Sequence, residues 1–270
     1  MLPAAAAVTS PLMQLDWPRL FPSGDFGFHM GLRPGEAPAF FSATAENGAL
    51  LAERGRWLDE APGDYAALLP EGADLFAEAA EFAAMRGAES GGDLIALGRA
   101  WEPDFVLLDS ALRVLGGVVC FPSAWALPEK LGRTLDQTHG PVPGLNAALA
   151  PRIHAALGKL APGAAWEREN WGLARDADRN HHPARARRRL DETITVGEVW
   201  LRVERQCLVR MARTGGLLFG IRLVLLPLAA VLAQPDAVDG LRRGLESMAD
   251  DVAEYKGLAR ARSTVLAWLR

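Results

Sequence analysis

The feature that most constrains this fold is a pair of strand-like segments joined by a glycine turn. Residues 199–207 alternate between apolar and polar side chains, which sends Arg202 and Glu204 to the same face of a strand. Thr214-Gly-Gly216 supplies turn residues, and the apolar run 217–225 follows with Arg222 inside it. We therefore expect a long antiparallel hairpin in this part of the chain.

The other segments predict further strands with helices between and after them. Short apolar runs at 105–109, 112–115 and 118–121 are typical of strands, and Gly116-Gly117 indicates a turn between the last two. Apolar spacings of three and four residues predict helices over 64–85, 145–160 and 236–269. We expect a break near Pro70 in the first of these and a kink or restart at Pro151 in the second. Strands in two antiparallel groups favour an α+β fold over a parallel βαβ sheet.

The chain divides into three segments that we expect to form a single domain. Residues 1–60 are rich in proline, glycine and aromatics without a sustained period, so we expect an extended arm packed on the core. Residues 61–233 would form the core and residues 234–270 the C-terminal helices. With 270 residues, of which 50% are hydrophobic and 23% charged, the chain can bury a large core and is not disordered.

Charge and cysteine content exclude several classes of protein. Lys and Arg number 29 against 33 Asp and Glu, a net charge of −4 that does not favour nucleic acid. Cys120 and Cys207 are too few for a disulfide framework, a cysteine-rich zinc site or an iron–sulfur cluster, although one disulfide between them stays open. Arg222 and Pro227 interrupt the apolar run 217–233, so we expect no membrane span, and we expect a reducing, cytoplasmic location.

The proline- and glycine-rich loop of residues 120–144 contains the first candidate site residue, His139. A loop of this composition has little conformational freedom, so it can hold an imidazole in place for metal ligation or proton transfer. Lys130 and Arg133 lie close enough in sequence to pair with an anionic ligand. The alternatives are an ordinary loop histidine and two solvated surface charges.

Three other groups of residues have both a structural and a functional interpretation. If their face is buried, Arg202 and Glu204 are paired, functional or both, and if it faces solvent they belong to an ordinary polar strand face. Arg222, among apolar residues, requires an anionic partner such as Glu204 or a ligand carboxylate. The segment Trp166–Trp171 lines a polar pocket or packs on the core. The His181-His182 pair could bind a metal ion. The arginines that follow form a solvated loop or a docking patch for an acidic partner. No dinucleotide or Walker A motif is present.

Short motifs in a fixed order resemble the haem-dependent oxidative N-demethylase family from about Phe28 to Leu228. The motifs are Cys120-Phe-Pro-Ser-Ala-Trp125, Glu129-Lys-Leu-Gly-Arg133, His139-Gly-Pro-Val-Pro-Gly144, Arg168-Glu-Asn-Trp171 and Arg202-Val-Glu-Arg-Gln206. The chain departs from the family pattern after the last motif, where Cys207 replaces the usual threonine and Arg210-Met-Ala replaces Arg-Leu-Pro.

The resemblance implies a PAS-like antiparallel sheet with surrounding helices and one bound haem b. It also implies NADPH-driven oxidation of dimethylamine by dioxygen to methylamine and formaldehyde, with flavin and iron–sulfur centres on partner reductase subunits. On this basis His139 is the haem ligand, with His154 as the fallback, and the other assigned residues are Lys130, Arg133 and Arg205 for cofactor binding and Arg202, Glu204 and Arg222 for catalysis. The alternatives are a non-catalytic haem or small-ligand sensor, favoured by an apolar distal face, and a haem-free interaction module.

Overall fold

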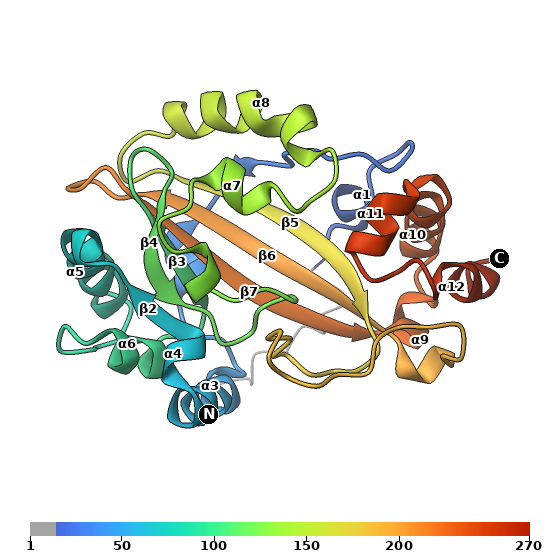
Figure 1. The fold of residues 1–270 in the computed structure, drawn as a ribbon, viewed down its shortest axis with the longest axis horizontal. Coiled ribbons are helices and arrows are strands. Elements are labelled where there is room, and N and C mark those ends of the chain that lie inside the picture. The colour runs from blue at the N-terminus through green and yellow to red at the C-terminus, as the bar shows by residue number, and fades with distance from the viewer. Residues whose placement is uncertain (1–14) are drawn as a thin grey trace, which may run out of the picture.

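A computed structural model of the chain describes residues 15–270, so residues 1–14 of the expected arm lie outside the described residues. The centre is a seven-stranded sheet with strand order β1-β5-β6-β7-β3-β4-β2, in which every pair of neighbours is antiparallel (Figure 1). The strands are β1 Arg33–Pro34, β2 Ala66–Leu68, β3 Asp104–Leu108, β4 Val114–Val118, β5 Ala165–Ala174, β6 Trp200–Arg210 and β7 Leu217–Pro227. The predicted α+β fold is confirmed.

The β6–β7 hairpin forms the middle of the sheet, and the alternating sequence predicted this hairpin. The register runs without a bulge and places Arg205 directly opposite Arg222. Strand β5 continues the pattern on the other side of β6, where Arg168 lies opposite Gln206. Because side chains alternate along a strand, the sheet has two distinct faces. We call them the α8 face, which includes Arg168, Glu204 and Leu217, and the α10 face, which includes Trp171, Arg205 and Arg222.

Helices cover the sheet on both faces and at both ends (Figure 1). Apolar side chains of α8 and of the loop before α7 pack on the β3, β4 and β7 side chains of the α8 face. Two further cores lie on the α10 face, one formed with α2, α3, α5 and α6 and the other with α1, α10, α11 and α12. The helices are α1 Trp17–Leu20, α2 Ala37–Phe41, α3 Asn47–Glu60, α4 Pro62–Tyr65, α5 Ala73–Ala84, α6 Leu94–Ala100, α7 Leu135–His139, α8 Leu145–Lys159, α9 Leu228–Val231, α10 Pro235–Ser247, α11 Asp250–Tyr255 and α12 Arg262–Trp268.

Several local predictions differ from the structure. The Gly116-Gly117 pair lies inside β4 instead of forming a turn, because β2 and β3 approach so closely there that a Cβ on Gly116 would lie 2.5 Å from the Ala67 carbonyl oxygen. The chain turns earlier, at Leu112, which has a positive φ of 62°. Helix α8 runs through Pro151 without a restart.

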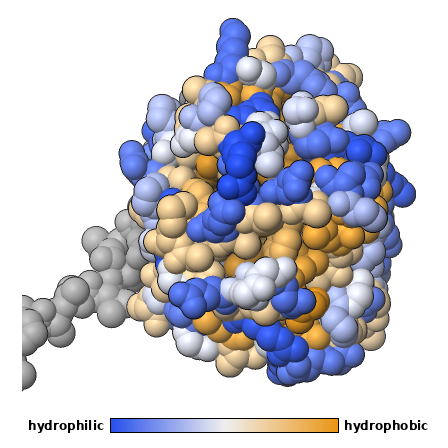
Figure 2. Space-filling model, turned by 90° about the vertical axis from the view of Figure 1, so that its left-hand side faces the viewer, coloured by the Kyte–Doolittle hydropathy of each residue, from blue (hydrophilic) through white to orange (hydrophobic). Residues whose placement is uncertain are grey.

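The expected arm also differs, because its described part contains helices α1, α2 and α3 and is not simply extended. The predicted strand and helix across 217–233 are present as β7 and α9. Both cysteines are buried free thiols, so the open alternative of a disulfide between them is not realised. Within residues 15–270, no helix combines the length and apolar character that crossing a bilayer requires. The end of the molecule near α5 shows hydrophilic side chains spread among hydrophobic ones (Figure 2).

Candidate functional site

His139 ends the short helix α7, which a capping box holds in place. The Thr134 side chain accepts from the backbone N–H of Gln137, and the Gln137 side chain accepts from the backbone N–H of Thr134. The His139 ring is half-buried, and its Nδ1 is buried without a hydrogen-bond partner in the described part of the chain. Burial, reinforced by the charge of Arg168, lowers the pKa of His139 to about 4. The imidazole is therefore neutral at pH 7, which leaves a nitrogen lone pair available for a ligand.

Arg168 lies on β5 with its side chain on the α8 face of the sheet. Its Nε is buried and has no hydrogen-bond partner among residues 15–270. Burial lowers the pKa of Arg168, while the nearby carboxylates of Glu204 and Glu169 act in the opposite direction. The Arg168 side chain is half-buried, and a buried guanidinium N–H without an acceptor is costly unless an anionic partner completes it. Sequence reasoning singled out the segment around Arg168 but did not assign this residue a role.

Glu204 lies on β6, on the same face as Arg168, and is held by two neighbours. Ser123 Oγ donates to Glu204 Oε1 at 2.5 Å, and Gln206 Nε2 donates to Oε2 at 2.9 Å. A carboxylate offers about four lone-pair sites, so two remain for another donor. The side chain is half-buried and its orientation is fixed from both sides.

Lys256 follows α11 and reaches the edge of β5 beyond the short stretch that pairs with β1. Its Nζ donates to the backbone carbonyl oxygen of Trp171 at 2.7 Å and lies 5.3 Å from the centre of the Trp171 ring. Burial lowers the pKa of Lys256 to about 8, with Arg168 adding to the decrease and Glu204 opposing it. His139, Arg168, Glu204 and Lys256 therefore share one electrostatic neighbourhood, which we call the His139 cluster.

The predicted cofactor residues Lys130 and Arg133 differ in position. Lys130 is half-buried, and its charge is among those that lower the pKa of His139. Arg133 is exposed, and no salt bridge joins it to another residue in the described range. Only Lys130 therefore lies in the neighbourhood of the His139 cluster.

Arg202 is buried, but its donors are used to hold two loops against the sheet. Its side chain is only 4% exposed, although it lies on the same face as Glu204. The acceptors are Ser123 Oγ and the carbonyl oxygens of Phe121, Pro122, Asp178 and Arg179, at 2.7–3.2 Å. These contacts make Arg202 a structural anchor for the two loops, and the catalytic role that we expected for it stays a prediction.

Arg222 and Arg205 lie on the α10 face, so neither shares a site with Glu204, and the expectation that Glu204 could be the partner of Arg222 is wrong. The Arg222 guanidinium pairs with Glu102 and also donates to the carbonyl oxygens of Phe40 and Ser42, each at 2.6 Å. Its anionic partner is therefore Glu102 and not Glu204. The sheet itself separates both arginines from the His139 cluster.

The remaining candidates lie outside the His139 cluster. His154 is partly exposed and its Nε2 lies 2.9 Å from an Asp136 carboxylate oxygen. His181 and His182 are buried, and no group of three or more metal-ligating side chains gathers anywhere in residues 15–270. Arg185 and Arg188 of the basic run pair with Asp178 and Glu198. Cavities of about 450 and 550 Å³ open elsewhere, and neither is lined by His139.

A protein-family model matches well over half of the chain. The family model described as haem-dependent oxidative N-demethylase, alpha subunit-like, matches residues 74–266. This range includes all four residues of the His139 cluster and β3 to β7 of the sheet. The chain therefore belongs to the haem-dependent oxidative N-demethylase, alpha subunit-like family.

Proposed function

We propose that this chain is the haem-binding subunit of an enzyme that oxidises a small methylated amine such as dimethylamine. Dioxygen would be the oxidant, and a partner reductase would deliver electrons from NADPH. The balanced reaction converts dimethylamine, dioxygen, NADPH and a proton into methylamine, formaldehyde, water and NADP⁺. The observation that carries the proposal is the neutral His139 imidazole, whose buried Nδ1 has no hydrogen-bond partner in the described residues.

The residues of the His139 cluster fit the chemistry of haem b. A neutral histidine supplies the nitrogen ligand that haem iron takes from proteins. Arg168 and Lys130 are cations in the same neighbourhood, and Arg168 has a buried Nε without an acceptor, as a partner of a haem propionate would. When bound, haem supplies the redox chemistry, and the protein supplies binding, orientation and electrostatics.

Glu204 is our candidate for amine binding. Its two unused lone-pair sites can accept N–H donors from a protonated amine, and Ser123 and Gln206 fix the direction in which those sites point. A carboxylate in the haem neighbourhood supports an amine-oxidising enzyme over a gas sensor with an apolar pocket. Two buried thiols are too few to hold an iron–sulfur cluster, which supports placing that centre on a partner subunit. The flavin is placed there on the family resemblance alone. The PAS-like arrangement and a cytoplasmic location belong to the same proposal.

Glu204→Gln tests the amine-binding role. It removes the negative charge while keeping nearly the same shape, so a charge-assisted hydrogen bond of about 2–3 kcal/mol is lost. We expect KM for dimethylamine to rise about 30- to 150-fold, because 1.4 kcal/mol corresponds to a factor of ten. The measurement is formaldehyde release by haem-loaded protein with a surrogate reductase at varied dimethylamine.

Glu246→Gln on the surface is the matched control, because Glu246 is about half exposed and, among residues 15–270, its salt bridge is to Arg242. It should leave KM unchanged. Equal KM values for Glu204→Gln and the unaltered protein would exclude Glu204 from amine binding. Absence of formaldehyde release from any methylated amine, with haem bound and reduced, would contradict the proposed activity itself.

A further inference from the structure

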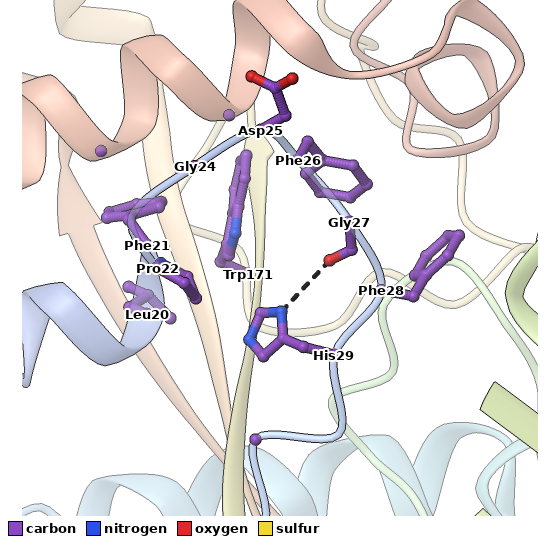
Figure 3. A pocket seen from close by; sticks show the side chains of 13 residues that line it. Leu20, Phe21, Pro22, Gly24, Asp25, Phe26, Gly27, Phe28, His29 and Trp171 are labelled. Carbon is purple, nitrogen blue, oxygen red and sulfur yellow. Dashed lines mark hydrogen bonds between the residues drawn. The ribbon is translucent and has the colours of Figure 1, made fainter. Parts of the chain in front are cut away.

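A second candidate binding site lies on the α10 face, in a cavity of about 450 Å³ (Figure 3). The segment 20–31 curves over Trp171 of β5 and over the glycines Gly240 and Gly244 of α10. The volume falls within the range of about 300–1,000 Å³ that small-molecule sites occupy. None of the residues assigned to haem or amine binding lines this cavity.

Aromatic rings form much of the wall of the cavity. The buried rings of Trp171 and Phe21 meet edge to face, with centroids 5.2 Å apart. Phe26 packs edge to face on Trp171 at 6.3 Å and on Phe28 at 5.8 Å, and both Phe26 and Phe28 are only half-buried. An aromatic ligand can pack against such rings in the edge-to-face or offset arrangement that aromatic pairs prefer.

Helix α10 lines the cavity with two glycines, Gly240 and Gly244, which leave room at these positions. A Cβ on Gly240 would lie 2.3 Å from Phe21 Cβ, so this glycine lets the segment 20–31 pack directly on the helix. A Cβ on Gly244 would lie 3.3 Å from Cζ2 of Trp171, so a larger side chain there would contact the aromatic wall. Gly244 therefore offers a way to fill the cavity by substitution.

Polar groups at the two ends of the aromatic wall are hydrogen-bond acceptors. Figure 3 shows Asp25 beyond one end of Trp171 and His29 beyond the other. His29 Nδ1 lies 3.2 Å from the Gly27 carbonyl oxygen, so it donates the proton and a neutral ring keeps its lone pair on Nε2. A cationic ligand is disfavoured because the Lys256 ammonium already lies against the Trp171 ring.

We propose that this cavity binds a small planar aromatic molecule that carries an N–H or O–H donor. Its ring packs against Trp171 and the half-buried phenylalanines, and its donor bonds to His29 Nε2. The site is independent of haem and of the proposed oxidation, so its test does not depend on either.

Calorimetric titration of the full chain with indole and with 1-methylindole tests the proposal. The two probes share a ring system, but only indole has an N–H donor. We expect both to bind, and indole about tenfold more tightly, since a typical hydrogen bond corresponds to roughly that ratio. Failure of indole to bind up to its solubility limit would overturn the proposal, and equal affinities would overturn the role of His29.

Two variants locate the binding. His29→Leu should reduce the affinity for indole to that for 1-methylindole, and His29 is exposed, so the fold should tolerate the change. Gly244→Leu should abolish binding of both probes by filling the cavity. Met85→Leu, at a residue 76% exposed on the end of α5, is the control and should bind both probes unchanged. Unchanged indole affinity in both His29→Leu and Gly244→Leu would show that the site lies elsewhere.

Discussion

Asp104→Ala should lower the free energy of unfolding by about 3–5 kcal/mol, the range for breaking a buried ion pair by removing one partner. Asp104 and Arg54 form a salt bridge in which the side chains are 2% and 0% exposed. The Asp104 carboxylate also accepts from the backbone N–H groups of Cys120 and Phe121, at 2.8 and 2.9 Å. Alanine would leave a buried guanidinium without its anion and two backbone donors without acceptors.

The measurement is urea unfolding of the purified chain followed by circular dichroism. Because small domains are stable by only about 5–15 kcal/mol, the variant should lose a large part of its stability. Asp59→Ala is the matched control, since Asp59 also pairs with an arginine, Arg99, but both side chains are exposed. Exposed pairs contribute little, so the control should unfold like the unaltered protein. A change in Asp104→Ala no larger than that in the control would contradict this account of the core.

Arg202→Leu should release the two loops that Arg202 joins to the sheet. The substitution removes the donors for one hydroxyl and four backbone carbonyls, in the segments 121–123 and 178–179. Each buried acceptor left unpaired costs about 1–3 kcal/mol, although loop carbonyls that regain water recover part of that. We expect about 3 kcal/mol of lost stability and faster amide exchange confined to these loops.

Hydrogen exchange read out by mass spectrometry measures this loop release directly. Arg202→Lys should restore only part of the protection, because a single ammonium cannot reproduce the fork of guanidinium donors. Arg188→Leu, at a side chain 69% exposed, should exchange like the unaltered protein. If Arg202→Leu leaves exchange in both loops unchanged, the anchor role assigned to Arg202 is wrong.

The hairpin was predictable because its alternation is local, whereas the faces of its charged residues were not. A shift of one residue in register moves every side chain of a strand to the other face. The face of Arg222 relative to Glu204 could therefore be predicted only if the exact length of the turn between β6 and β7 were known. In the observed register Arg222 of β7 lies directly opposite Arg205 of β6, which puts Arg222 and Glu204 on opposite faces. Its partner Glu102 lies 120 residues away in the sequence, and no local pattern indicates such a contact.

The candidate site was predicted in part. His139 stood out because its loop is rich in proline and glycine, but the same loop gave no information on what lies opposite the ring. Arg168 occurs between Trp166 and Trp171, in a segment that sequence reasoning did not predict to be a strand, and its place on the α8 face is set by the pairing of β5 with β6. Lys256 directly follows the C-terminal helix α11, which approaches β5 only in the folded chain. Such neighbours are set by tertiary packing and not by sequence spacing.

Haem titration of the full chain, followed by its visible absorption spectrum, tests the central claim most directly. The unaltered protein should take up one haem and give the Soret band of a histidine-ligated haem. His139→Ala should lose that band, and His154→Ala should keep it, because His154 is partly exposed and pairs with Asp136. A colourless unaltered protein, or an unchanged spectrum in His139→Ala, would contradict the assignment of His139 as the haem ligand.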